Sequence, residues 1–328
     1  LYVFNNPWSL QSMEKQTSYC AMMRLGFPIP ETWLIPPKSY ADSEDLRPTL
    51  DRYARLFDLG EIGDQMGYPL FLKPYDGGAW VGVTAVKDAD SLMAAYNSSG
   101  TRVMHLQKGV IPHDAFVRCV GLGPQWRCVN YDPDAPLHDR YRTEVDFLPP
   151  EQEKHLTDMT MVINAFFGWD FNSCEALRSE GVWHPIDFAN ACPDSQVTSL
   201  HFHFPWLIKA NLRWSLFCAA TGRRMKTNLN WHEYFTIADS DAPFEEKMAG
   251  YVALAEAHFD IPRFEAFCAE HLSHLDEVAD DFFSSSRARE AIREKVASLY
   301  PLSEVEEFTE LFWQRVQSAL ATERNDRS

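Results

Sequence analysis

The fold is decided by residues 68 to 88, which read YPLFLKPYDGGAWVGVTAVKD. Residues 68–73 form a short apolar run, and residues 80–86 have the alternating pattern of a second strand. A glycine-bearing turn, residues 74–79, separates the two runs. This order predicts a β-hairpin with a flexible, glycine-rich tip.

The tip of this hairpin has the composition of an anion-binding loop. Gly77 and Gly78 lack the Cβ that would prevent close approach, so their backbone N–H groups can point together at an anion. Lys73 stands at the end of the strand that leads into the loop. A phosphate-binding loop and an ordinary hairpin turn with a strand-end lysine are both compatible with this segment alone, because Gly-Gly turns are common.

The composition is that of a globular protein with a sizeable core. The chain has 328 residues, of which 45% are hydrophobic, and its formal net charge is −17. That charge argues against nucleic acid or an anionic membrane as the main partner. Seven cysteines without a CxxC pair indicate reduced thiols and a cytoplasmic protein, and no apolar run reaches the length of a membrane span. The chain opens on Leu1, and we expect a segment upstream of it.

The first third predicts helices around the hairpin. A helix over Ser12–Leu25, capped by Ser12 and with Lys15 facing solvent, precedes a proline-broken extended stretch, FPIPETWLIP. A second amphipathic helix is expected over 43–59. After the hairpin, a short helix over 90–96 and a strand over 102–107 are expected.

The rest of the chain predicts a second β region followed by helices. The alternating stretches 115–122 and 125–131 predict an antiparallel hairpin, and a polar loop over 132–144 follows. The remaining predictions are a helix over 150–167, strands over 169–178 and 182–188, and helices over 205–220, 243–258, 261–271, 286–299 and 303–321. The fold class is therefore α+β with an all-helical C-terminal extension, which is docked on the front half.

A second group of polar residues lies on the later strand pair. Glu175 and Asp187 fall on two adjacent strands of one hairpin, where alternation allows both to project from the same face, and Asn190 follows the second strand. Two carboxylates and an amide oxygen form a hard, oxygen-rich site suited to Mg²⁺. The alternative is that both carboxylates face solvent and Asn190 supports a turn.

Taken together, these features resemble the ATP-grasp superfamily, in its carboxylate-amine ligase branch with D-alanine ligases, glutathione synthetase and ribosomal-protein glutamate ligases. The first two motifs are Lys15 followed by FPIPETW, and FLKPYDGGAWVGV. The others are the strand that ends at Gln107 and Lys108, and the set formed by Glu175, Asp187 and Asn190. The resemblance covers roughly residues 10 to 190. It implies a nucleotide held between two α+β subdomains.

The resemblance also implies a role for each motif residue. Lys15 and Lys73 would lie near the phosphates, and the loop from Asp76 to Gly82, with Gly77 and Gly78, would close over the triphosphate. The remaining roles are Gln107 and Lys108 beside the adenine, Asp114 toward the ribose, and Glu175, Asp187 and Asn190 on one or two Mg²⁺ ions.

Three positions depart from the family pattern. Asp187 stands where glutamate is usual, with Asn190 one position later than expected, and Ser173 stands where an arginine often holds the acyl phosphate. Arg118, Arg140 or Arg142 would supply the positive charge that such an arginine provides. The alternative for each of them is a structural salt bridge. Gln107 replaces a frequent glutamate, and its amide still suits pairing with a base.

The implied activity is an ATP- and Mg²⁺-dependent ligase that joins a small-molecule carboxylate to an amine. Lys73, Arg118 and Arg140 are the catalytic candidates, because phosphoryl transfer needs positioning and charge neutralisation. A phosphotransferase on the same site and a non-catalytic nucleotide-binding module, assembling through its helical tail, are the alternatives. The expected segments are 1–67 leading into the core, 68–107 as the lid subdomain, 108–204 as the large subdomain, and 205–328 as the helical extension.

Three further features favour ordinary structural roles. His201 and His203 alternate, but no third ligand stands at metal-binding spacing, so packing is expected. Cys174 is expected to be a buried small hydrophobe. The basic run at Arg223, Arg224 and Lys226 either meets an anionic ligand or caps a solvated helix end.

Overall fold

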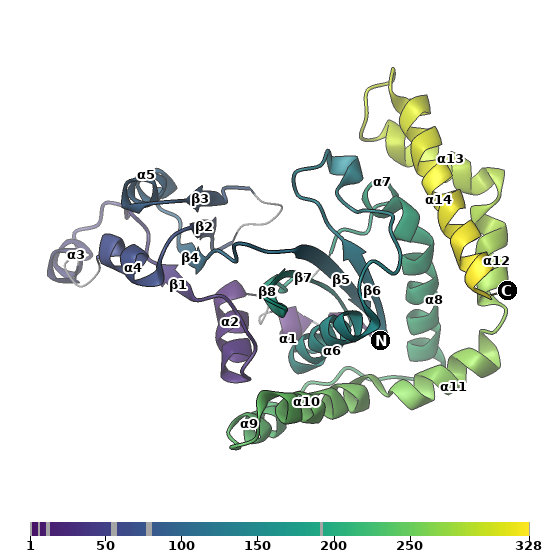
Figure 1. Cartoon of the computed structure of the whole chain (residues 1–328), viewed down its shortest axis with the longest axis horizontal. Helices are drawn as coiled ribbons and strands as arrows, with labels where there is room; N and C mark the ends of the chain where they lie inside the picture. Colours follow the sequence, from purple (N-terminus) through teal and green to yellow (C-terminus); the bar gives the residue numbers. More distant parts are fainter. Residues whose placement is uncertain are drawn as a thin grey trace. The chain divides into compact units, whose positions relative to one another are not determined.

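The computed structural model describes residues 2–5, 7–10, 14–53, 58–76, 81–190 and 193–327, and its elements are labelled in Figure 1. The chain forms two compact units. Unit 1 comprises Leu1–Gln11, Phe116–Glu175 and Asn190–Ser328, and unit 2 comprises Ser12–Ala115 and Ala176–Ala189. These units do not coincide with the four segments expected from the sequence, because the helical region groups with the second β region.

Unit 2 contains a four-stranded antiparallel sheet. Its strands, in the order β1-β4-β2-β3, are β1 (Thr32–Ile35), β4 (Met104–Lys108), β2 (Leu70–Pro74) and β3 (Thr84–Val86). The predicted hairpin is confirmed, with a shorter second strand than the pattern indicated. The edge strand β1 was not predicted, since the prolines around it indicated only an extended stretch; prolines are compatible with an edge position.

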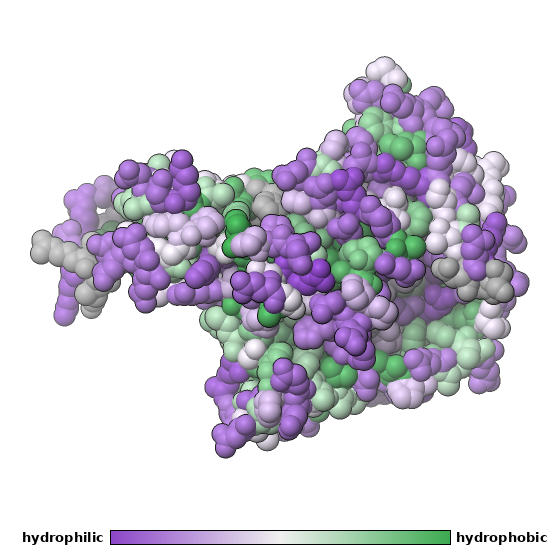
Figure 2. Space-filling model, in the orientation of Figure 1, coloured by the Kyte–Doolittle hydropathy of each residue, from purple (hydrophilic) through white to green (hydrophobic). Residues whose placement is uncertain are grey.

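The two faces of this sheet differ in chemistry. One face presents the alternate residues Leu70, Leu72, Met104 and Leu106, which belong to a buried core shared with α4 (Leu59–Met66) and α5 (Ala89–Ser99). The outer sides of α4 and α5 are largely hydrophilic (Figure 2). The intervening residues must face the other way, and besides the apolar Leu34 and Ala85 they are Thr32, Phe71, Lys73, His105 and Gln107. We call these five residues the polar face.

The helices of unit 2 correct two expectations. The first helix, α2 (Lys15–Arg24), is capped by the side chain of Glu14, which accepts from two backbone N–H groups; Ser12, the expected cap, lies outside the described residues. The helix expected over 43–59 is found in part, as α3 (Arg47–Tyr53), and residues 54–57 of that range lie outside the described residues. Its expected end is wrong, because Asp58 is extended and caps the separate helix α4 by accepting from the Glu61 N–H. A Cβ on Gly63 of α4 would lie 2.4 Å from the Tyr68 hydroxyl, so this helical glycine allows close packing.

A second sheet has the strand order β6-β5-β7-β8. Its strands are β5 (Ala115–Leu122), β6 (Gln125–Asn130), β7 (Phe171–Ser179) and β8 (Val182–Asp187). The β5–β6 hairpin is confirmed, as is α6 (Pro150–Phe167), which begins with proline and ends at the left-handed Gly168. Glu175 and Asp187, expected on one face of one hairpin, fall in different units: β7 up to Glu175 belongs to unit 1, whereas β8 belongs to unit 2.

The helical region of unit 1 contains five predicted helices and further ones that the pattern missed. The predicted helices are α8 (Phe204–Ala220), α10 (Phe244–Phe259), α11 (Ile261–His271), α13 (Ser286–Ala297) and α14 (Val305–Arg327). The missed ones are α7 (Val197–Leu200), α9 (Trp231–Ala238) and α12 (Leu275–Phe283), and the short α1 (Pro7–Leu10) near the start of the chain was also missed. Several of its aromatic residues pack together inside: the ring of Phe217 lies 5.4 Å from those of both Trp214 and Phe264. None of the described helices is long and apolar enough to cross a membrane.

Candidate functional site

A chain of hydrogen bonds runs across the polar face. Lys73 Nζ donates to Gln107 Oε1 at 2.6 Å, Gln107 Nε2 donates to Thr32 Oγ1 at 2.9 Å, and the Thr32 hydroxyl donates to the Pro30 carbonyl at 2.7 Å. Gln107 and Lys73 come from neighbouring strands, and Gln107 is 2% exposed. The amide of Gln107 therefore holds the Lys73 ammonium group in this structure. Its contact with an adenine stays a prediction.

Lys15 and Asp187 form an ion pair in unit 2. Lys15 opens α2, Asp187 ends β8, and the Nζ to Oδ2 distance is 2.7 Å. The Lys15 side chain is 15% exposed, so the expectation that it faces solvent is wrong. The Tyr19 hydroxyl, one turn further along α2, donates to the Ile186 carbonyl at 2.8 Å and ties the helix to the same strand. Lys15, which is expected at the phosphates, thus contacts Asp187, which is expected to bind the metal.

His105 is a buried part of the polar face that the sequence reading missed. It is 1% exposed, and neither ring nitrogen has a hydrogen-bond partner among the described residues. Burial lowers its pKa to about 4, with Glu14, Lys15, Lys73 and Asp187 contributing smaller effects of both signs. The signal was present in the sequence, because His105 stands two positions before Gln107 on one strand and must share its face.

Arg118 and Glu175 form a second ion pair, in unit 1. Arg118 Nη2 lies 2.6 Å from Glu175 Oε1, and both side chains are nearly buried. Arg118 also donates to the Tyr141 hydroxyl, and its guanidinium lies 5.6 and 5.5 Å from the ring centres of Tyr131 and Tyr141. Burial opposes its charge, but Glu175 and the two tyrosines more than compensate and raise the pKa of Arg118. This arginine is a fixed cation beside a predicted metal ligand.

Asn190 lies next to the start of β7. Its backbone N–H donates to Asn172 Oδ1 at 3.0 Å, and its side-chain amide donates to Ser173 Oγ at 3.4 Å. The amide nitrogen is therefore turned to Ser173, which leaves the amide oxygen as the available ligand atom. Within the described ranges no cluster of three or more His, Cys, Asp or Glu side chains could hold a metal. The predicted set is smaller, two carboxylates and one amide, and its oxygen chemistry fits Mg²⁺.

The remaining predicted ligand residues are placed as follows. Asp114 forms a two-point ion pair with Arg178, with oxygen to nitrogen distances of 2.9 and 3.1 Å, so its contact with a ribose stays a prediction. Lys108 and Asp76 are exposed. Gly77 and Gly78, the predicted flap glycines, lie outside the described residues.

The loop arginines have structural partners. Arg140 Nε donates to the Ala135 carbonyl at 3.2 Å, and Arg142 pairs with Asp132. Both contacts brace the loop between β6 and α6. The structure thus favours Arg118 over Arg140 as a cation beside the predicted site, and the catalytic role of Arg140 stays a prediction.

The two histidines and Cys174 are packed as expected. His201 stacks against Phe312 at 6.2 Å, and His203 Nε2 lies 2.8 Å from the Arg142 carbonyl. Burial lowers the pKa of His201 to about 3 and that of His203 to about 4. Cys174 is fully buried.

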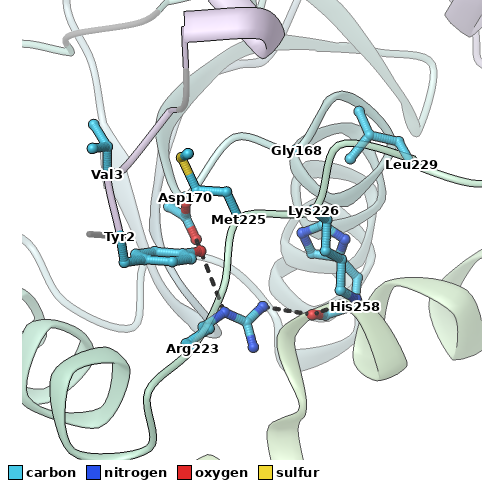
Figure 3. Close-up of a pocket in the computed structure, with 9 residues that line it drawn as sticks. All are labelled: Tyr2, Val3, Gly168, Asp170, Arg223, Met225, Lys226, Leu229 and His258. Atoms are coloured by element: carbon cyan, nitrogen blue, oxygen red, sulfur yellow. Dashed lines mark hydrogen bonds between the residues drawn. The ribbon is translucent and has the colours of Figure 1, made fainter.

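Two residues of the basic run, Arg223 and Lys226, line a small pocket in unit 1 (Figure 3). Arg223 donates to the carbonyl of His258, in the last turn of α10, at 2.7 Å, and Lys226 donates to the same oxygen at 3.2 Å. Arg223 also lies over the Trp214 ring at 4.8 Å. These contacts satisfy a carbonyl in the last turn of α10, and an anionic ligand for this run stays a prediction.

Comparisons with known proteins give matches among solved structures alone. No family model and no curated protein matches the sequence. A structure of D-alanine–D-alanine ligase from Bacillus anthracis complexed with ATP is similar over 77% of this chain and 68% of its own, with 14% identity and a TM-score of 0.45. A second structure of D-alanine–D-alanine ligase from Bacillus anthracis covers 64% of this chain and 69% of its own, with 18% identity and a TM-score of 0.47.

A third similar structure is a RimK domain protein ATP-grasp from Sphaerobacter thermophilus DSM 20745. It is 18% identical over 56% of this chain and 60% of its own, with a TM-score of 0.39. These proteins are of the kinds that the sequence motifs resemble. All three TM-scores lie below 0.5, so the proposals below rest on the residues of this chain.

Proposed function

We propose that this protein is an ATP- and Mg²⁺-dependent ligase of the ATP-grasp type, which joins a small-molecule carboxylate to an amine. The observation that carries the proposal is the ion pair between Lys15 and Asp187. The motif assigns one of these residues to phosphate and the other to the metal, and they are 172 positions apart in the sequence. Their meeting in unit 2, the unit that also holds Lys73, supports a shared ligand.

The proposed reaction has two steps. A substrate carboxylate oxygen attacks the γ-phosphorus of ATP, the bond to the β-phosphate oxygen breaks, and an acyl phosphate and ADP result. The amine then attacks the acyl carbon, the carbon–oxygen bond to phosphate breaks, and the amine loses its proton as phosphate leaves. The first step places a negatively charged nucleophile against a triphosphate, so cationic side chains that neutralise charge accelerate it.

The chain supplies those cations in restrained positions. Lys73 is held by Gln107, and Lys15 by Asp187, so each ammonium group is already oriented before a phosphate arrives. Arg118 is fixed by Glu175 and two tyrosine rings, which suits the binding of an acyl phosphate or the carboxylate that precedes it. Glu175, Asp187 and Asn190 would hold Mg²⁺, which shields the phosphate charge when bound.

Product analysis tests the proposal directly. The protein is incubated with ATP and Mg²⁺ and with panels of small acids and amines, each alone and in pairs. ADP and phosphate released together only when both an acid and an amine are present would support the ligase. A stable phosphorylated compound would identify a phosphotransferase, and nucleotide binding without turnover across the panels would identify a non-catalytic module.

A binding measurement with a non-hydrolysable ATP analogue tests the assigned cations. Lys73→Met should weaken binding about tenfold or more, because a charge-assisted contact to phosphate is lost. Lys154→Met is the matched control, since Lys154 is exposed on α6 and pairs with Asp158 in the next turn. Equal affinities for the two variants would contradict the assignment of Lys73.

A further inference from the structure

His105 has no evident structural reason to be a histidine. Its imidazole is 1% exposed, and both ring nitrogens lack hydrogen-bond partners among the described residues. Burying an unpaired polar group is unfavourable, so such groups are rare in the interior of a folded protein. An apolar residue would fill the same space without that penalty. A binding partner for the ring is the physical explanation that removes the conflict.

The surroundings of the ring hold it in one orientation. Tyr75 stacks on it with ring centres 5.5 Å apart and planes 29° apart, and Tyr19 meets it edge-on at 6.1 Å. His105 is also the direct strand partner of Lys73. The ring is thus held between aromatic neighbours, and both of its nitrogens are buried without a hydrogen-bond partner among the described residues. A group that is held in one orientation before its ligand arrives is preorganised for binding.

We propose that His105 binds the nucleotide directly, with one imidazole nitrogen donating a hydrogen bond to a phosphate oxygen beside Lys15 and Lys73. The inference rests on the proposed function, because it assumes that a nucleotide occupies the polar face. It adds a residue that the motif resemblance does not assign.

Two of the four charged neighbours of His105 favour phosphate over the base. Glu14, Lys15, Lys73 and Asp187 all act on its ring electrostatically, and the motif places the two lysines at phosphates. Gln107, the other polar residue of the same strand face, is already bonded to Lys73 and Thr32. The lowered pKa of His105, caused first by burial, keeps the imidazole neutral at pH 7, so it offers an N–H donor without repelling either lysine.

The test compares wild type with His105→Leu in two measurements. The first is the Tm of the protein without ligand, and the second is the Kd for ADP, for adenosine and for a non-hydrolysable ATP analogue. The expected result is an equal or higher Tm for His105→Leu, because unpaired polar atoms are removed. ADP and the ATP analogue should bind about tenfold more weakly, and adenosine should bind as it does to wild type.

Two further variants keep the test decisive. His201→Leu removes another fully buried histidine, in the helical region, and should leave every Kd unchanged. His105→Asn keeps an N–H donor near the same place, and its ADP affinity should lie between those of wild type and His105→Leu. If His105→Leu does not fold, His105→Phe takes its place, because it also removes both ring nitrogens, and an ADP affinity equal to that of wild type then overturns the inference.

Other outcomes overturn the inference in distinguishable ways. Unchanged ADP affinity in His105→Leu excludes the contact, and an equal loss for ADP and adenosine excludes phosphate as its partner. A lower Tm for His105→Leu shows that the ring is bonded within the protein. Absence of nucleotide binding by wild type overturns the proposed function itself, whereas the other results leave that function standing.

Discussion

Nζ of Lys15 lies 2.7 Å from Oδ2 of Asp187, and each side chain is partly buried. One is the first residue of a helix, and the other is the last residue of a strand much later in the chain. In the proposed function both charges are needed for a ligand, so the pair as it stands neutralises the groups that would bind it. A bound nucleotide and its metal must therefore replace this contact.

Asp187→Asn should change ADP binding in opposite directions with and without Mg²⁺. Without the metal, loss of the competing carboxylate frees Lys15, and affinity should rise about threefold. With Mg²⁺ present, affinity should fall below that of wild type, because a hard oxygen ligand is lost. Titration calorimetry of both proteins, with Lys15→Met as the variant that weakens binding in either condition, measures this. If Asp187→Asn raised the ADP affinity in both conditions, or lowered it in both, the assignment of Asp187 to the metal would be contradicted.

Breaking the pair of Arg118 and Glu175 should cost more stability than breaking an exposed pair. Arg118→Met leaves a nearly buried carboxylate, and we expect it to lower the free energy of unfolding by about 3 kcal/mol. Arg118→Met combined with Glu175→Gln should lower it by less than the sum of the single changes, because the two groups are coupled. The control cycle is Arg178 with Asp114, whose carboxylate is exposed, and its coupling should be much smaller. Urea unfolding measures both cycles, and equal couplings would contradict this ranking.

Asp170 should make the protein less stable as the pH rises from about 4 to about 6. Burial raises its pKa to about 6, despite hydrogen bonds from Tyr2 and Trp214, so the folded state binds a proton more readily than the unfolded state in this range. The free energy of unfolding should fall by roughly 3 kcal/mol from this group and then level off.

The measurement is urea unfolding of wild type and Asp170→Asn at several pH values. The difference between the two proteins isolates Asp170, because the buried histidines, which act in the other direction, contribute equally to both. Their pKa values are lowered, so they remove stability as the pH falls below about 6.5. A difference that does not change between pH 4 and 6 would show that the pKa of Asp170 is ordinary.

Gly123→Ala should be far more disruptive than Gly181→Ala. Both glycines turn a hairpin with positive φ, of 55° and 80°. A Cβ on Gly123 would lie 2.4 Å from the indole of the fully buried Trp214, whereas a Cβ on Gly181 would meet nothing within 4 Å. We expect losses of about 3 kcal/mol and about 1 kcal/mol in the free energy of unfolding. Similar losses in urea unfolding would show that backbone strain, and not contact with Trp214, is the main effect.

The sequence predicted those parts of the fold that local patterns decide. The hairpin of β5 and β6 follows from alternation and a Gly-Pro turn, and α6 follows from helical spacing and its first proline. The end of the helix expected over 43–59 was wrong, because Asp58 caps a separate helix that carries two glycines. That helix is stabilised by packing on the sheet, which no local pattern reports.

The sequence predicted which residues belong to the candidate site better than it predicted which of them contact one another. Lys73 and Gln107 were expected near one ligand, and they are found hydrogen-bonded. The partners of Lys15, Arg118 and Asp114 were not expected, since each ion pair joins residues far apart in sequence. Sequence spacing fixes which face of a strand a residue occupies, but the pairing of charges depends on how the elements pack.

Unit 2 is assembled from two separate stretches of chain, and this has a consequence for proteolysis. The second stretch, Ala176–Ala189, contains β8 and the exposed turn at Glu180 and Gly181. A single cut in that turn would leave Lys15 on the N-terminal fragment and Asp187 on the C-terminal one. Both units draw on both fragments, so co-elution of the fragments after nicking would report how firmly units 1 and 2 together hold them without a peptide bond.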